Sequence, residues 1–245
     1  MPAADYRQRI YEHYVKSHPA LAGQRTLADL APRRPYLEKL IREHFPADRG
    51  ATIIDTGCGH GALLHFARAA GYANMIGVDG SPQQVALAAQ LGIEGVREGD
   101  VMETLRALAD ESQDAVVSFD VIEHFTKEEA VAFVDEVLRV LAPGGRWIVH
   151  TCNGESPFFG ESRHGDFTHE VTYTNASMQQ LLTASGFREV RGYEDQPVPH
   201  GLKSAVRWLL WKLFRAVMRL YIAAETGDTG RGAILSRNFL AVALK

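Results

Sequence analysis

The sequence predicts an α/β fold: a doubly wound, mostly parallel sheet of seven strands, with N-terminal helices and a helical insertion before the last strand. Two observations carry this prediction. From Ala51 onward, short β-rich runs alternate with helical segments, a pattern typical of parallel strands joined by crossover helices. A glycine-rich turn follows the first of these runs, as doubly wound folds require at their ligand-binding edge.

The chain begins with a helical segment that precedes the sheet. Apolar residues recur at helical spacing before Pro46 and the turn at 48–50 end the pattern. The residues that carry this spacing are Tyr36, Leu37, Leu40, Ile41 and Phe45.

Five β-rich runs come next, and a helical segment follows each of the first four. The runs are Thr52–Asp55, Met75–Asp79, Gly95–Gly99, Ala115–Phe119 and Arg146–Thr151. The helical segments are His60–Ala70, Pro82–Leu91, Glu103–Ala109 and Lys127–Leu141, and the last is ended by Pro143, Gly144 and Gly145.

A loop rich in Gly, Phe and His follows, and the chain then closes with a helix and two strands. These segments are the loop Asn153–His169, the helix Asn175–Ser185 and the strands Phe187–Glu194 and Phe239–Leu244. We expect one domain made of a cap at 1–48, a core at 49–194, an insertion at 195–238 and a last strand at 239–245.

The composition limits the classes of function. At 245 residues, with 46% hydrophobic and 23% charged side chains, the chain can bury a full core. Its formal net charge of -4 gives no overall attraction to nucleic acid or anionic lipid, so an anionic partner would have to be bound by a local patch. Cys58 and Cys152 lack metal-ligand spacing, which favours free thiols in the cytoplasm. The start of the chain lacks the apolar region of a signal peptide.

Polar groups end several successive predicted strands. Gly57, Gly59 and Gly61 form a turn after the first strand, where backbone must approach a ligand without Cβ atoms in the way. Asp79 ends the second strand, where a carboxylate can accept hydrogen bonds from two ribose hydroxyls. Asp100 follows the third strand. These groups should meet at one edge of the sheet.

Five segments together resemble motifs I to V of the class I S-adenosylmethionine-dependent methyltransferases, over roughly residues 36–195. They read IDTGCGHG, GVDGS, EGDV, DAVVSFDVIEHF and LAPGGRWIV. The resemblance implies that the three glycines line the methionine part of the cofactor and that Asp79 holds its ribose. It further implies a cofactor site that includes Asp55, which supports the turn and the amino group, Asp100 and Val101 at the adenine, Phe119 beside the sulfonium, and the motif residues Cys58 and Gly80.

Two alternatives to a methyltransferase remain at this stage. A nicotinamide dehydrogenase carries Gly-x-Gly-x-x-Gly, whereas here the third glycine comes one residue earlier and His60 stands within the turn. A cofactor-binding relative without catalysis is the other alternative, since fold does not imply function.

Methyl transfer to a hydroxyl needs alignment and a base near neutral pKa, a requirement that histidine meets best. His169 is the first candidate and Asp166 the carboxylate that would orient it; hydrogen bonds that only pin the loop are the competing interpretation. His124 follows the fourth predicted strand and should face the cofactor cleft. A structural role is the alternative to a catalytic role for this residue. Only Asn153 stands where cation-dependent O-methyltransferases carry an Asp-Asn pair, so we predict no metal.

The insertion at 195–238 is the most individual part of the chain. Residues 203–224 read as an amphipathic helix with Trp208 and Trp211 on or beside its basic face. This pattern suits peripheral membrane contact or a sugar or lipid-linked acceptor; a helix packed on the sheet or against a second copy in an oligomer is the alternative. The apolar face holds Leu209, Leu210, Leu213, Ala216, Val217 and Leu220, and the basic face holds Arg207, Lys212, Arg215 and Arg219.

The phrase GDFTHEVTYTNASMQQLL also resembles bacterial methyltransferases associated with surface-polysaccharide synthesis. That resemblance implies O-methylation of a sugar or glycan, and an acidic sugar could meet Arg163, His164, Lys203 and Arg207. The alternative acceptor is a quinone, phenol or other small metabolite. Nucleic acid is disfavoured as a partner by the acidic balance and by Phe119-Asp-Val-Ile in place of a motif for a flipped base. We expect a cytoplasmic protein, with the inner face of the membrane as an alternative location.

Overall fold

The computed structural model describes residues 6–14, 26–228, 230 and 232–245, and the rest of the predicted N-terminal cap lies outside these residues. Seven strands form one sheet in the order β3-β2-β1-β4-β5-β7-β6. All pairs are parallel except those of β7, which runs antiparallel to both β5 and β6. The strands are β1 (Ile53–Thr56), β2 (Met75–Asp79), β3 (Val96–Glu98), β4 (Gln113–Phe119), β5 (Leu141–Cys152), β6 (Glu189–Glu194) and β7 (Asn238–Leu244).

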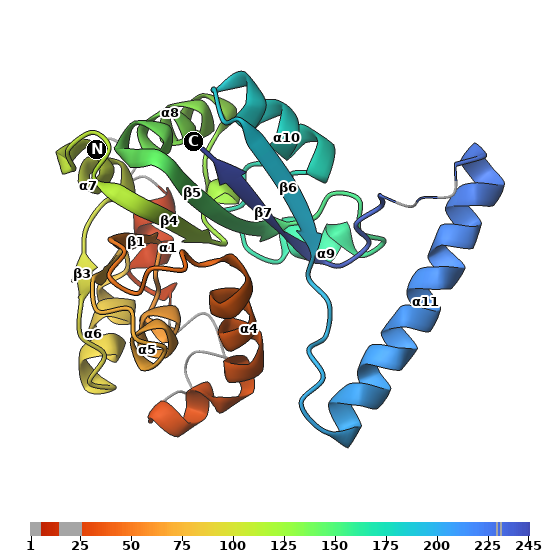
Figure 1. Cartoon of the computed structure of the whole chain (residues 1–245), viewed down its shortest axis with the longest axis horizontal. Helices are drawn as coiled ribbons and strands as arrows, with labels where there is room; N and C mark the ends of the chain where they lie inside the picture. The colour runs from red at the N-terminus through yellow and green to blue at the C-terminus, as the bar shows by residue number, and fades with distance from the viewer. Residues whose placement is uncertain (1–5, 15–25, 229, 231) are drawn as a thin grey trace.

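Helices cover both faces of the sheet (Figure 1). One face carries α4 (Arg34–His44), α5 (Ala62–Ala69) and α6 (Pro82–Gln90), and the other carries α7 (Val101–Ala107), α8 (Lys127–Val140) and α10 (Asn175–Ala184). Each layer closes its own cluster of buried apolar side chains on the sheet. The predicted doubly wound, mostly parallel fold is therefore confirmed.

Local signals explain why these elements begin and end where they do. Thr126 caps α8, accepting a hydrogen bond from the backbone of Glu129, whose side chain in turn accepts from the Thr126 backbone. β5 begins at Leu141, five residues before the predicted start at Arg146. Leu141 pairs with Gln113 ahead of a register shift in the ladder, so an irregularity accommodates the Pro-Gly-Gly segment that the sequence suggested as a break.

The loop predicted at 153–169 contains a short helix, α9 (Phe159–His164), that the sequence did not indicate. Its N-cap residue is Phe158, which makes no side-chain cap, and Gly160 lowers its intrinsic helix propensity. Before the sheet, the described part of the N-terminal cap forms α1 (Tyr6–Tyr11) and a 3-10 helix, η1 (Leu27–Arg33), besides α4.

The insertion forms a single helix of 25 residues, α11 (Leu202–Thr226), which lies apart from the sheet (Figure 1). Ser204 is its only buried residue. The alternative that this helix packs its apolar face on the sheet is therefore wrong. No helix in the described part of the chain is both long and apolar enough to cross a membrane.

Candidate cofactor and acceptor site

The glycine-rich turn after β1 has the backbone that the sequence requires of it. Gly57, Gly59 and Gly61 have φ angles of 69°, 56° and 80°, in the left-handed region that favours glycine. The turn is tied to the next strand because the N–H groups of Gly57 and Cys58 donate to the Val78 carbonyl at 2.8 and 3.0 Å. A Cβ atom on Gly57 would lie 2.3 Å from Val121 Cγ2, so this approach tolerates no side chain.

Asp79 connects the two halves of the cofactor edge. Its Oδ2 atom accepts a hydrogen bond from the Gly59 N–H at 2.7 Å, and its Oδ1 atom accepts from the Ser81 N–H at 2.9 Å. Each carboxylate oxygen has a second lone pair, which is available to a ribose hydroxyl. The carboxylate therefore both shapes the turn and remains a hydrogen-bond acceptor for a ligand.

Two buried polar atoms beneath the turn have no hydrogen-bond partner among the described residues: Asp55 Oδ1 and His60 Nε2. Burial, and then the nearby Asp79 charge, raises the pKa of Asp55 well above its usual range. Unpartnered buried groups are uncommon in native proteins and indicate a ligand or water. Together with the open glycine turn, they fit a cofactor that carries amino and hydroxyl groups.

The other predicted cofactor residues occupy different environments. Asp100 is exposed and caps α7, with its Oδ1 accepting from the Glu103 N–H at 2.9 Å. Val101 packs against the core. The Cys58 side chain points toward Gly77 of β2, so only its backbone is positioned for a cofactor. Cys58 and Cys152 are both free thiols, as the sequence predicts.

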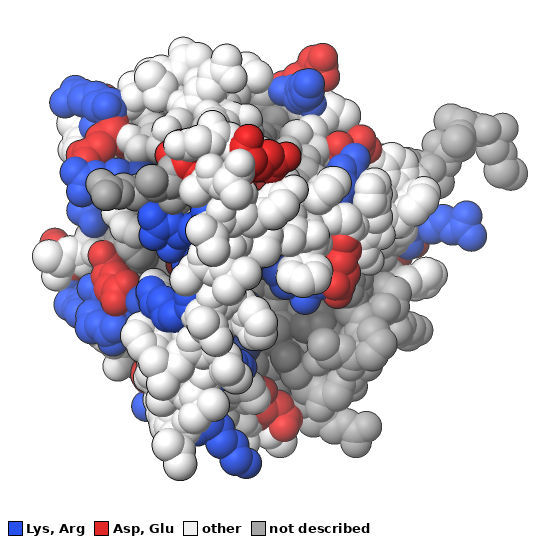
Figure 2. Space-filling model, turned by 90° about the vertical axis from the view of Figure 1, so that its right-hand side faces the viewer, with Lys and Arg blue, Asp and Glu red and all other residues white. Residues whose placement is uncertain are grey.

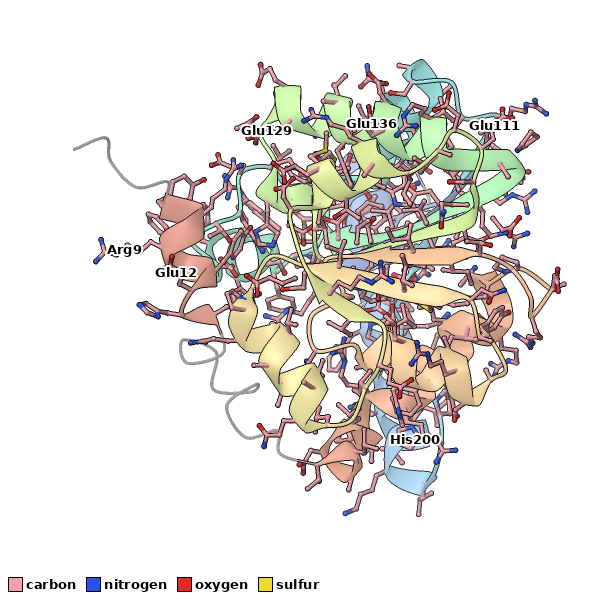
Figure 3. The ribbon with its side chains drawn as sticks, turned by 90° about the vertical axis from the view of Figure 1, so that its left-hand side faces the viewer. Arg9, Glu12, Glu111, Glu129, Glu136 and His200 are labelled. Atoms are coloured by element: carbon pink, nitrogen blue, oxygen red, sulfur yellow. The ribbon has the colours of Figure 1, made fainter. Side chains whose placement is uncertain are left out.

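Helix α1 lies across this edge of the sheet. Ser81 Oγ donates to the Tyr11 carbonyl at 3.0 Å, and the Tyr11 ring lies 6.4 Å from that of His124. Arg7 forms an ion pair with Glu129 of α8 at 2.9 Å. Arg9 projects from the outer side of α1 into solvent (Figure 3). The helix therefore covers the site with its inner side, where Tyr11 lies.

Asp166 is linked to His124 through Thr168. His124 Nδ1 lies 2.7 Å from Thr168 Oγ1, and Thr168 Oγ1 donates to Asp166 Oδ1 at 2.6 Å. Because the Thr168 hydroxyl donates its proton to Asp166, it accepts a hydrogen bond from His124 Nδ1. Nδ1 is therefore the protonated nitrogen of His124, and Nε2 keeps its lone pair. Burial, and then the neighbouring His169, lowers the pKa of His124 to about 4, so this ring is neutral at physiological pH.

His169 has its own orienting group. Its Nδ1 atom lies 2.8 Å from the Ser162 carbonyl oxygen, which can only accept, so Nδ1 carries the proton and Nε2 is the basic nitrogen. The rings of His169 and His124 lie edge to face, 4.8 Å apart. The predicted pairing of His169 with Asp166 stays a prediction, whereas the Ser162 carbonyl is an orienting partner that the sequence did not indicate.

A third histidine, His150 near the end of β5, was missed by the sequence analysis. It lies 2.7 Å from Asp120 and 3.5 Å from Asp195, and its ring stacks on Phe119 at 4.4 Å. Burial alone lowers the pKa of His150, but Asp120, together with Asp195, outweighs it and raises the pKa to about 10. The ring is thus a cation at neutral pH and serves poorly as a base. Asp120 precedes the predicted His124, but no local signal linked His150 or Asp195 to it.

Glu123 is buried beside this group. Its Oε2 atom accepts a hydrogen bond from Thr151 Oγ1 at 2.8 Å. Burial, and then the charge of Asp120, raises the pKa of Glu123 to about 8. A carboxyl group that is neutral in the folded protein and charged in the unfolded chain makes stability depend on pH.

Replacing Glu123 with glutamine should flatten the fall of the melting temperature between about pH 5 and pH 9. Because the folded-state pKa of Glu123 is raised, its contribution is full below the unfolded pKa of about 4.3 and is lost as the pH rises through about 8. The Tm of the variant should exceed that of the wild type at the alkaline end, by about 2–4 °C per kcal/mol recovered. Thermal melts over this pH range measure it.

The matched control for this prediction is Glu128→Gln, which changes an exposed glutamate of α8. This variant should keep the wild-type slope. A Glu123→Gln protein with the same pH dependence as the wild type would show that Glu123 is charged when folded.

We call His150, together with Asp120, Asp195 and Phe119, the His150 cluster. A groove of about 520 Å³ opens beside this cluster and shares Asp195 with it. Its lining includes Tyr36 and Asp195, together with Arg207 and Trp211 of α11 and Arg237. Asp195 links the groove to His150 at 3.5 Å, and the His150 ring stacks on Phe119 at the end of β4, where the sulfonium is predicted. The four residues suggested for an acidic acceptor do not act alike, since Arg163 donates to the backbone carbonyls of His169 and Glu170 while Arg207 lines the groove.

The described ranges contain no group of three or more His, Cys, Asp or Glu side chains placed to hold a metal ion. The absence of a metal stays a prediction. Asn153, the residue on which that prediction depends, is fully buried and donates to the carbonyls of Ile234 and Ser236 at 2.7 and 2.8 Å. Its amide therefore holds the chain that enters β7.

The sheet order, the glycine turn and the carboxylate at the end of β2 are those of the class I S-adenosylmethionine-dependent methyltransferase fold. S-adenosylmethionine is its cofactor, as the sequence predicts. Residues 54–149, which run from β1 to β5, match the family model described as a methyltransferase domain.

Curated relatives support the same class. The chain is 30% identical to a probable S-adenosylmethionine-dependent methyltransferase of Mycolicibacterium smegmatis, over 68% of this chain and 65% of that protein. It is 26% identical to the human probable tRNA methyltransferase 9B, over 79% of this chain and 40% of that protein. It is 30% identical to a ubiquinone biosynthesis O-methyltransferase of Chelativorans sp., over 49% of this chain and 51% of that protein. The aligned regions thus span 40% to 65% of the lengths of these relatives.

The fold also matches solved structures. A SAM-dependent methyltransferase from Archaeoglobus fulgidus aligns over 98% of this chain and 100% of that chain, with a TM-score of 0.64 and 17% identity. At this identity the likeness concerns the fold alone.

Proposed function

We propose that the protein transfers the methyl group of S-adenosylmethionine to a hydroxyl group of a sugar or bacterial surface glycan. The observation that supports this acceptor is the groove beside His150, which offers Trp211 next to Arg207 and Arg237. Sugars present apolar ring faces and many hydroxyls, and they suit a site that combines an aromatic side chain with hydrogen-bond donors. An acidic sugar would in addition be attracted by the two arginines.

In this proposal, separate groups of residues bind the cofactor, accept the proton and support the cleft. The turn at 57–61 and Asp79 hold the cofactor, whose sulfonium supplies an electrophilic methyl group. His169 Nε2 accepts the proton of the acceptor hydroxyl, while the Ser162 carbonyl keeps the ring in the required tautomer. The His150 cluster, held between Asp120 and Asp195, supports the Phe119 ring at the cleft. Alignment of the hydroxyl with the methyl group supplies much of the remaining rate.

A methyl-transfer assay tests this function. The protein is incubated with S-adenosylmethionine labelled in its methyl group and with three acceptor panels: bacterial surface glycans and their sugars, phenols and quinone precursors, and oligonucleotides. Label in the glycan panel alone supports the proposal, and nuclear magnetic resonance of the product then locates the new methoxyl group. Label in another panel, or in none while S-adenosylhomocysteine still binds, would contradict it.

An O-methyltransferase of a quinone, phenol or other small metabolite is the second candidate. It is favoured by the likeness to the ubiquinone biosynthesis O-methyltransferase and by α1, which brings the Tyr11 ring near His124. Such an acceptor needs an apolar, closed pocket rather than an open polar groove. Replacing Trp211, which lines the groove, with alanine should therefore impair a glycan acceptor strongly and a small phenol little.

A further inference from the structure

The exposed side of α11 is built from apolar residues, and we propose that it docks the protein on an anionic lipid surface. Phe214 is 65% exposed, Leu213 58% and Leu220 70%, and a contiguous patch of such side chains marks an interaction surface. These three belong to an apolar stripe that also includes Leu202, Val206, Leu209, Leu210, Val217 and Tyr221. The stripe runs along most of the 25-residue helix.

The apolar stripe faces away from the protein body because polar contacts hold the opposite side. Arg215 donates to Glu194 at 2.6 Å and to the Ala233 carbonyl at 3.2 Å. Ser204, the buried residue of the helix, accepts from the His200 N–H at 2.7 Å. Surface helices normally bury their apolar face in the core. Here that face is left for a partner outside the described chain.

The charges beside the stripe point to a bilayer rather than to a second copy of the chain. Helix α11 contains five Lys or Arg and a single acidic residue, Glu225 in its last turn, although the whole chain carries a net charge of -4. Arg215 is paired with Glu194, so the basic residues that would meet the headgroups are Lys203, Arg207 and Lys212. Figure 2 shows a band of uncharged side chains on this side of the molecule, with Lys and Arg and also Asp and Glu beside it. Two such helices packed together would oppose like charges, whereas anionic lipid headgroups would neutralise them.

Trp208 and Trp211 lie on the same side of α11 as Arg215, opposite the apolar stripe, and Trp211 lines the groove against the protein body. Lys212 Nζ lies 5.3 Å from the ring centres of both Trp208 and Trp211. In an interfacial helix the apolar stripe lies at the edge of the acyl chains, and long basic side chains such as Lys212 extend to the headgroups. This docking would orient the Arg207 and Trp211 groove next to the membrane surface, and it does not depend on the proposed acceptor.

Vesicle co-sedimentation of the full chain tests the proposal. The probes are phosphatidylcholine vesicles with and without about 30 mol% phosphatidylglycerol. The wild type should bind the anionic vesicles and lose binding as salt is raised. The partition coefficient of the double variant Leu213→Gln/Leu220→Gln should be lower than that of the wild type by about tenfold or more, because two apolar side chains that insert are removed. Val131→Gln changes an exposed apolar residue of α8 and should behave as the wild type.

A second pair of variants separates charge from apolar insertion. Lys203→Gln/Lys212→Gln should lower binding to the anionic vesicles and leave the weak binding to phosphatidylcholine unchanged. S-adenosylhomocysteine titration and circular dichroism confirm that each variant is folded. Absence of wild-type binding, or equal binding by the Leu213→Gln/Leu220→Gln protein, would overturn the proposal. A dimer in sedimentation equilibrium that this double variant dissociates, with no vesicle binding, would assign the stripe to self-association instead.

Discussion

Replacing His169 with alanine should lower kcat by about 10²- to 10⁴-fold on the acceptor that the methyl-transfer assay identifies. The Ser162 carbonyl, 2.8 Å from Nδ1, leaves the Nε2 lone pair as the group that takes the hydroxyl proton. Removal of the ring removes that base but none of the contacts of the glycine turn or of Asp79. Affinity for S-adenosylhomocysteine should therefore stay at the wild-type value, and this separates loss of a base from loss of the fold.

The matched control for His169 is His65→Ala, which removes a half-buried histidine of α5 that has no assigned role in the site. Its turnover should equal that of the wild type. Unchanged turnover in His169→Ala would contradict the assignment and make His124 the next candidate, because the Thr168–Asp166 chain leaves His124 Nε2 unprotonated. A kcat loss in His124→Ala together with wild-type activity in His169→Ala would complete that reassignment.

Replacing Asp79 with alanine should weaken S-adenosylhomocysteine binding by about 100-fold or more. The change removes the acceptor for the ribose hydroxyls, and it also frees the Gly59 and Ser81 N–H groups that the carboxylate holds at 2.7 and 2.9 Å. Hydrogen bonds to a charged group contribute about 1.5–3 kcal/mol each, and a factor of ten corresponds to about 1.4 kcal/mol. Calorimetric titration measures the loss.

Asp135→Ala provides the control for Asp79, because it deletes an exposed carboxylate on α8. Its affinity should match the wild type. Asp79→Asn retains one acceptor oxygen and should fall between the wild type and the alanine variant. Wild-type affinity in Asp79→Ala would place the ribose elsewhere and contradict the role that the methyltransferase resemblance implies.

Much of the cofactor edge could be predicted because its signals are local. The glycines at 57, 59 and 61 suit a turn with positive φ, and strand periodicity predicts that β2 ends at Asp79. The acceptor side was less accessible to prediction. Asp166 and His169 were expected as a pair from their proximity in sequence, yet Asp166 reaches His124, 42 positions earlier, through Thr168.

The sequence by itself determined the order of strands and helices, the parallel sheet and the cofactor turn, because hydrophobic periodicity and glycine requirements act over a few residues. Only the tertiary structure decided which distant side chains share a buried space. It brought His150 between Asp120 and Asp195, and it turned the apolar side of α11 outward. The physical reason for the first is that nearby carboxylates raise the pKa of a histidine, and only folding brings these carboxylates close to it. The reason for the second is that the helix pattern specifies an apolar face but not its partner.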